Sequence, residues 1–208
     1  MDNTHRPGLC IAALVGAVML MAPQAAAQPV PLFPAQVSQS NIDCLFSAQC
    51  TIAPHDEATN IPLGSVSGNA ILHSRTFLGA ADSRAPGRTG YQYRIDLTGA
   101  TALGDSACIT NLSVKFGPVA KLPYAPGVIL RDVYEVRQGA PANQVSFESA
   151  AQTGDVVTFT FAPGRLCAGG SSFFFGLASL DAPVRGVHVQ IDVPGTDDIQ
   201  VQSFGPRR

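Results

Sequence analysis

The sequence predicts an all-β protein, a single antiparallel β-sandwich of immunoglobulin-like or jelly-roll-like type with roughly nine to ten strands. Apolar and polar residues alternate along several short segments, as in strands with one buried and one wet face. The 20 glycines and 16 prolines are scattered between these segments, where they favour turns. No segment shows the period of an amphipathic helix. A closed β-barrel is the alternative architecture that this pattern allows.

Residues 1–27 have the features of a secretory signal peptide. Arg6 precedes an apolar run of about 14 residues, too short to cross about 30 Å of bilayer as a helix. A small-residue exit, Ala25-Ala26-Ala27, follows the run and resembles a cleavage site. Arg6 stands alone, so a twin-arginine signal is not indicated. We therefore expect Sec-type export to the periplasm or the external medium of a bacterium.

The rest of the chain divides into an arm and one domain. Residues 28–40 contain three prolines and no periodicity, which predicts a linker or an extended arm. Residues 41–208 form the expected β-sandwich domain. No further apolar stretch reaches membrane length, so we expect no transmembrane segment in the mature chain.

The clearest strand covers residues 91–97. One face carries Tyr91, Tyr93, Ile95 and Leu97, and the other carries Gln92, Arg94 and Asp96. The same alternation marks residues 111–116, 156–161 and 187–193. Less regular patterns predict strands over residues 70–78, 133–137, 145–147, 172–180 and 199–204.

Four cysteines remain after removal of the leader, an even number in an oxidising compartment. We expect Cys44–Cys50 to close a short loop near the start of the domain. The second expected pair, Cys108–Cys167, joins two strand regions that are distant in sequence. Loop-closure entropy gives these bridges about 2 and about 4 kcal/mol, respectively. Metal binding is disfavoured, because paired short cysteine knuckles are absent.

The densest polar cluster is His55-Asp56-Glu57. Three consecutive side chains rarely converge on one ion, so we interpret this cluster as a solvated loop that is also a candidate binding position. Calcium at loops between strands is the one metal left open. Asp197-Asp198 resembles a turn more than a calcium loop, because no alternating acidic run is present. No other cofactor is indicated.

Two further segments have an unusual composition. Residues 104–106 (Gly-Asp-Ser) resemble a fragment of an esterase nucleophile block, but they lack the strand-turn-helix context that such a serine needs. Phe173-Phe174-Phe175 is the most unusual apolar block, and in a strand its residues face both sides. We expect burial on both faces, with Phe174 as the candidate that presents an aromatic ring to a partner.

The low charge, with a net value of −2, gives no field that would attract nucleic acid. No catalytic residues are indicated by any motif. The function that we expect is a non-enzymatic exported β-sandwich with a binding or structural role toward an unknown envelope or extracellular ligand. Two alternatives remain: a secreted hydrolase or lyase that uses His55, His73 or His188 with an aspartate, and a self-assembling surface or matrix component.

Overall fold

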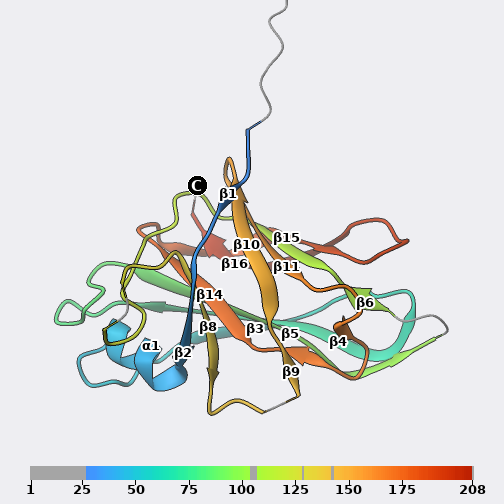
Figure 1. The fold of residues 1–208 in the computed structure, drawn as a ribbon, viewed down its shortest axis with the longest axis horizontal. Helices are drawn as coiled ribbons and strands as arrows, with labels where there is room; N and C mark the ends of the chain where they lie inside the picture. The colour runs from blue at the N-terminus through green and yellow to red at the C-terminus, as the bar shows by residue number, and fades with distance from the viewer. Residues whose placement is uncertain (1–26, 104–106, 128, 142, 208) are drawn as a thin grey trace, which may run out of the picture.

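The computed structural model describes residues 27–207 other than 104–106, 128 and 142. Within these residues, two β-sheets pack face to face and one short helix lies against the outer side of one sheet (Figure 1). The expected β-sandwich is thus confirmed, and the two sheets do not join into the alternative barrel within this part of the chain. The expected leader falls outside the described residues except for Ala27, and the Gly-Asp-Ser segment lies wholly outside them.

The six-stranded sheet is antiparallel throughout. Its strands, in spatial order, are β1 (Val30–Pro31), β10 (Phe147–Thr153), β11 (Val156–Phe161), β7 (Asn111–Lys115), β15 (Pro183–Asp192) and β16 (Ile199–Pro206).

The eight-stranded sheet is mostly antiparallel and is built around the long strand β5. One path runs through β2 (Pro34–Ser38), β8 (Val133–Gln138), β14 (Phe174–Ser179), β5 (Thr89–Ala102), β13 (Ser171–Ser172) and β9 (Gln144–Val145). On the other side of β5 lie β4 (Val66–Leu78) and then β3 (His55–Asn60). A separate ribbon pairs β6 (Cys108–Ile109) with β12 (Leu166–Cys167). The structure has more strands than expected, because two-residue strands and the polar strand β3 give no alternating pattern.

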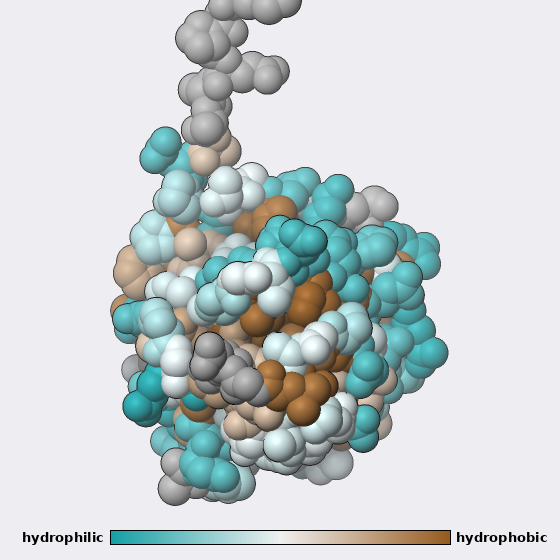
Figure 2. Space-filling view, turned by 90° about the vertical axis from the view of Figure 1, so that its right-hand side faces the viewer, coloured by the Kyte–Doolittle hydropathy of each residue, from teal (hydrophilic) through white to brown (hydrophobic). Residues whose placement is uncertain are grey.

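The main core fills the space between the sheets. Its fully buried members include the four apolar residues of the 91–97 strand, as the alternation predicts. Phe175 is central, because its ring lies 4.6 Å from the ring of Phe159 and 5.8 Å from that of Phe161, on the facing sheet. Tyr93 also links the sheets by donating from its hydroxyl to the Phe204 carbonyl at 2.9 Å. Figure 2 views one end of the sandwich, where hydrophobic side chains gather between more hydrophilic surroundings.

The proline-rich arm is extended, as expected, but it is part of the fold and not a free linker. Its first strand, β1, pairs with β10 in the six-stranded sheet, and its second, β2, pairs in parallel with β8 in the other sheet. The arm therefore crosses from one layer to the other along one side of the sandwich (Figure 1). Prolines suit this position, because edge strands tolerate their missing N–H donors.

The sequence shows no convincing amphipathic helix, but the structure contains one short helix in the described residues, α1, over Gln39–Phe46. Ser38 caps this helix: its hydroxyl accepts from the Asn41 N–H at 3.1 Å, and the Asn41 side chain accepts from the Ser38 N–H at 3.0 Å. The helix buries Ile42, Leu45 and Phe46. Eight residues give too short a window for a helical period to be recognised.

The helix covers part of the outer face of the eight-stranded sheet and creates a second apolar cluster there. The ring of Phe46 meets that of Phe77 edge-on at 4.8 Å, and Tyr124, from the segment before β8, lies 4.7 Å from Tyr134. This cover explains why Gln92 is fully buried although the alternation places it on a wet face. Its amide donates to the Gln39 side chain of α1 at 3.3 Å.

Both expected disulfides are formed. Cys44–Cys50 ties the end of α1 to the following loop, and Cys108–Cys167 joins the paired strands of the β6–β12 ribbon. The short bridge thus holds the cover of the second cluster, and the long bridge fixes two segments 59 residues apart in sequence.

Candidate functional site

The outer face of the eight-stranded sheet is covered on one side only. Beyond α1, neighbouring strands present Arg75 (β4), Arg94 (β5) and Phe174 (β14) on this face. The register explains why they meet: β4 pairs with β5 so that His73 lies opposite Arg94, and β14 follows on the other side of β5. Charged and aromatic groups thereby gather on a surface that no other element covers among the described residues.

Phe174 lines a groove of about 290 Å³, here called the Phe174 groove. The guanidinium carbon of Arg75 lies 4.2 Å from the centre of the Phe174 ring, and that of Arg94 lies 5.6 Å away. Both distances suit a cation–π contact. Three amide side chains complete the polar part of the lining: Gln39, Gln138 and Gln144. No carboxylate lines this groove within the described residues.

Each arginine has a carboxylate partner at the edge of the groove. Arg75 pairs with Asp56 across β3 and β4 at 3.1 Å, and the Asp56 side chain is 60% exposed. Such solvated pairs contribute little, typically about 0–1 kcal/mol. Arg94 pairs with the more buried Asp96 at 3.2 Å. Water and an anionic ligand can therefore compete for Arg75 more readily than for Arg94.

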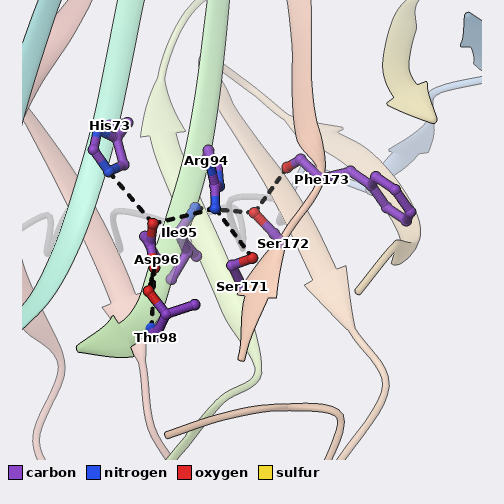
Figure 3. A network of polar contacts seen from close by, with 8 residues as sticks. All are labelled: His73, Arg94, Ile95, Asp96, Thr98, Ser171, Ser172 and Phe173. Carbon is purple, nitrogen blue, oxygen red and sulfur yellow. Dashed lines mark hydrogen bonds and ion pairs between the residues drawn. The ribbon is translucent and has the colours of Figure 1, made fainter. Parts of the chain in front are cut away.

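Asp96 is the centre of the polar network in Figure 3. Burial works to raise its pKa, but two hydrogen bonds from Thr98 and the charge of Arg94 hold the pKa below its ordinary value. The Thr98 N–H and hydroxyl donate to Asp96 at 3.0 and 2.6 Å. Asp96 is therefore a fixed negative charge near neutral pH.

His73 faces the same carboxylate, with 3.8 Å between its Nε2 and Oδ2 of Asp96 (Figure 3). Burial is the main cause that lowers the pKa of His73; Arg94 and Arg75 lower it further, while Asp96 opposes them. The imidazole is thus favoured in its neutral form. His73 and Arg75 are two residues apart and share one face of β4.

The hydroxyls near this pair are engaged elsewhere. Ser171 accepts from Arg94 at 3.3 Å. The Ser172 hydroxyl accepts from the Ile95 N–H at 2.9 Å and donates to the Phe173 carbonyl at 2.8 Å (Figure 3). Neither contact links a hydroxyl to His73, so no nucleophile–base relay of the serine-hydrolase kind is assembled by these groups.

The cluster His55-Asp56-Glu57 is a strand and not the expected loop, because these residues pair along β3 with the edge of β4. Strand alternation separates their side chains. Asp56 reaches Arg75 on the outer face, whereas Glu57, opposite Ser74, has a carboxylate oxygen that is buried without a hydrogen-bond partner in the described structure. His55 lies against a separate cavity near the end of β4.

The three histidines of the domain are distributed over three strands, β3, β4 and β15, and no hydrogen bond joins any two of them in the described residues. Among those residues, no three His, Cys, Asp or Glu side chains converge as ligands for a metal ion. At the Asp197-Asp198 turn, Asp198 accepts a hydrogen bond from Gln190 at 2.9 Å.

The aromatic block has one residue on each face of the sheet. Phe174 is half-buried under Arg75 on the outer face. Phe175 is fully buried between the sheets. The contribution of Arg94 was missed by the sequence analysis, because only the strand register reveals which residues border Phe174. The polar face formed by Gln92, Arg94 and Asp96 is the sequence feature that places Arg94 on the outer side of its strand.

No helix in the described part of the chain combines the length and apolar character needed to cross a membrane. Comparisons with known protein families, with curated proteins and with solved structures find no match to this chain.

Proposed function

We propose that this chain is an exported, non-enzymatic binding protein of the bacterial envelope or medium that holds a carboxylate-bearing ligand, such as an acidic glycan, in the Phe174 groove. The observation that carries this proposal is one half-buried ring flanked by two guanidinium groups in a lining without carboxylates. The ligand should therefore carry a negative charge.

Export is supported by two independent features. Residues 1–27 have the composition of a secretory leader. The two disulfides favour an oxidising compartment, since cytosolic thiols are kept reduced.

The chemistry of the groove favours a planar anion with further hydrogen-bonding groups. A guanidinium binds a carboxylate through two parallel N–H donors, which adds geometric selectivity to the charge attraction. An incoming carboxylate would replace exposed Asp56 at Arg75 at little cost. The amides of Gln138 and Gln144 offer donors and acceptors to neighbouring hydroxyl groups, whereas the Gln39 amide is already bound to Gln92 and Asp43. The Phe174 ring offers an apolar surface.

The test is calorimetric titration of the disulfide-bonded protein with oligogalacturonate and with a neutral dextran of equal length. We expect the uronate to bind and its affinity to fall as salt is added. Arg75→Gln should weaken binding about tenfold or more, because a hydrogen bond to a charged group contributes about 1.5–3 kcal/mol. Phe174→Ala should weaken it as well.

Arg165→Gln is the matched control, since Arg165 is exposed and lies outside the groove lining. Its affinity for the uronate should equal that of the parent protein. Equal binding of uronate and dextran, or equal losses for the Arg75 and Arg165 variants, would contradict the proposal.

The His73–Asp96 pair favours one second candidate, a hydrolase or lyase in which neutral His73 acts as a general base. This alternative predicts turnover of ester or uronate substrates that is lost in His73→Gln and Asp96→Asn. Ligand binding without turnover, unaffected by His73→Gln, would favour the non-enzymatic proposal.

A further inference from the structure

Five strands of the eight-stranded sheet reach one end of it side by side. The register pairs the end of β4 with the start of β5, and the start of β5 with the end of β14. The starts of β8 and β2 continue the same line beyond β14. The residues at or next to these five strand ends are here called the strand-end row. The row lies at one end of the sandwich and includes no residue of the Phe174 groove.

Four large apolar side chains of the strand-end row are exposed. Leu78 ends β4 and is 67% exposed, and Leu180 follows β14 and is 70% exposed. Leu130, three residues before β8, is 58% exposed, and Phe33, directly before β2, is 56% exposed. Single exposed leucines are ordinary on protein surfaces, but several at one end of a protein are typical of a surface that binds a partner.

Two arginines lie among these apolar residues without a partner of their own. Arg88 directly precedes β5, the strand between the ends that carry Leu78 and Leu180. Arg131 follows Leu130 in the chain. Neither guanidinium has an ion pair or a side-chain hydrogen bond among the described residues. Both charges are therefore available to a partner.

Two pairs of opposite charges near the row leave no net charge. Lys121 binds Asp132 at 3.4 Å, and the Asp132 side chain is also held by the Phe33 N–H at 3.0 Å. Asp82 and Arg84 lie two residues apart in the loop between β4 and β5. These groups do not offset the charges of Arg88 and Arg131.

Asp181 is the remaining carboxylate of the row, and two more cations lie near it. The Arg207 N–H donates to the carbonyl of Ala182, the residue after Asp181, at 2.8 Å. Arg185 belongs to the exposed start of β15, four residues beyond Asp181. This end of the protein is therefore cationic, although the whole chain has a net charge of −2.

An anionic lipid bilayer suits this surface better than a second copy of the chain. In a symmetric pair of copies, Arg88 and Arg131 would face like charges. The apolar side chains come from separate strands and have cations between them, so a rigid partner would need a matching pattern of holes and carboxylates. Fluid acyl chains can surround each apolar side chain while lipid phosphates meet the guanidinium groups.

We propose that the strand-end row docks the protein on the surface of an anionic bilayer. Leu78, Leu180, Leu130 and Phe33 would enter the boundary between headgroups and acyl chains. The groove residues Gln138 to Gln144 lie at the opposite end of β8, so a docked protein would hold the Phe174 groove away from the membrane. The docking does not depend on which ligand the groove binds.

Flotation with extruded vesicles tests the docking on the disulfide-bonded protein. Vesicles of equimolar phosphatidylcholine and phosphatidylglycerol should bind it, and vesicles of phosphatidylcholine alone should bind at least about tenfold less, because each arginine near an anionic surface adds about fivefold. Added salt should weaken the binding. Equal binding to both kinds of vesicle, or no binding to the anionic vesicles, would overturn the proposal.

Arg88→Gln combined with Arg131→Gln tests the role of the charges. This variant should bind the anionic vesicles about tenfold or more weakly, while its circular dichroism stays that of the parent protein. Arg165→Gln is the matched control, because Arg165 is exposed and lies between β11 and β12, outside the row. Equal affinities of the double variant and the control would exclude the two arginines as lipid contacts.

A tryptophan placed at one end of the protein tests the orientation, since the chain has none of its own. Leu180→Trp should show a blue shift in fluorescence with anionic vesicles, and brominated lipids should quench it. Leu103→Trp is the control, because Leu103 is 61% exposed and follows the opposite end of β5. Equal quenching of both variants would contradict docking through the strand-end row.

Leu180→Ser separates the bilayer from a second copy as the partner. It should weaken binding to anionic vesicles about threefold or more, and light scattering without lipid should show a monomer for both the parent and the variant. A parent dimer that Leu180→Ser dissociates, together with no vesicle binding, would make the row an interface between copies and refute the lipid proposal.

Discussion

The outer face of the eight-stranded sheet has two halves that differ in what lies above them. In the covered half, Phe77 and Tyr134 pack under α1 and form a second core. In the open half, Arg75 and Arg94 border Phe174 at the surface. Arg75 and Phe77 are two residues apart on one strand and point the same way. An element outside the strand therefore decides whether its outward side chains become part of a core or of a surface site.

Titratable groups show the same contrast. In the covered half, burial raises the pKa of the Tyr124 and Tyr134 phenols well above their ordinary value, so both stay neutral. In the open half, the pKa values of His73 and Asp96 are lowered, the first mainly by burial and the second despite it. The phenols of the covered half are therefore kept neutral, whereas the open half holds a neutral imidazole beside a charged carboxylate.

Removing the anchor of the cover should have the largest effect on stability. Phe46 is fully buried against Phe77, so Phe46→Ala should lower the free energy of unfolding by about 3–5 kcal/mol. Urea unfolding followed by circular dichroism measures the loss. Phe33→Ala, at a side chain that is 56% exposed, is the control and should change stability by less than about 0.5 kcal/mol. Equal losses would mean that α1 is not a stabilising cover.

Opening the short disulfide should have a smaller effect, localised to the cover. Cys44→Ser with Cys50→Ser should lower the free energy of unfolding by about 2 kcal/mol, since the bridge closes a loop with a sequence separation of only 6. Limited proteolysis should then cut first between α1 and β3. Initial cleavage in the open half, for example near residues 138–144, would show that the bridge does not hold the cover.

Acidification should produce the smallest effect, and it should come from the open half. The pKa of His73 in the folded protein lies below the ordinary histidine value of 6.5. As pH falls, the unfolded chain therefore takes up this proton first. The stability due to neutral His73 then declines below about pH 6.5. Asp96 adds a further loss as pH falls through its folded pKa, which lies below 3.8. Urea unfolding across this pH range should show a shallower decline between pH 7 and 5 in His73→Gln. An identical slope in the parent and the variant would exclude His73 as its source.

Much of the fold could be predicted because strand alternation reports burial between two layers. Tyr91, Tyr93, Ile95 and Leu97 all lie in the main core as their spacing indicates. The disulfide pairing follows from the positions of four cysteines along that pattern. These features depend on period and spacing, which a sequence displays directly.

The cover and the site depend on contacts that a sequence does not display. Gln92 was expected on a wet face, yet α1 buries it. His55-Asp56-Glu57 belongs to β3, an edge strand that is held by backbone pairing to β4. These residues show no apolar alternation, so the sequence does not indicate a strand there. Phe174 could be singled out by composition alone, but its neighbours Arg75 and Arg94 follow from the register of three strands.

The crossing of the N-terminal arm has a consequence for the order of assembly. The Phe33 N–H donates to the side chain of Asp132, 99 residues further along the chain. A ribosome makes the arm near the beginning, but its partners on β8 and β10 emerge only after more than half of the polypeptide. That side of the nascent protein must therefore stay open, with unpaired strand edges, until late in synthesis, which makes it the region where a chaperone has most to protect.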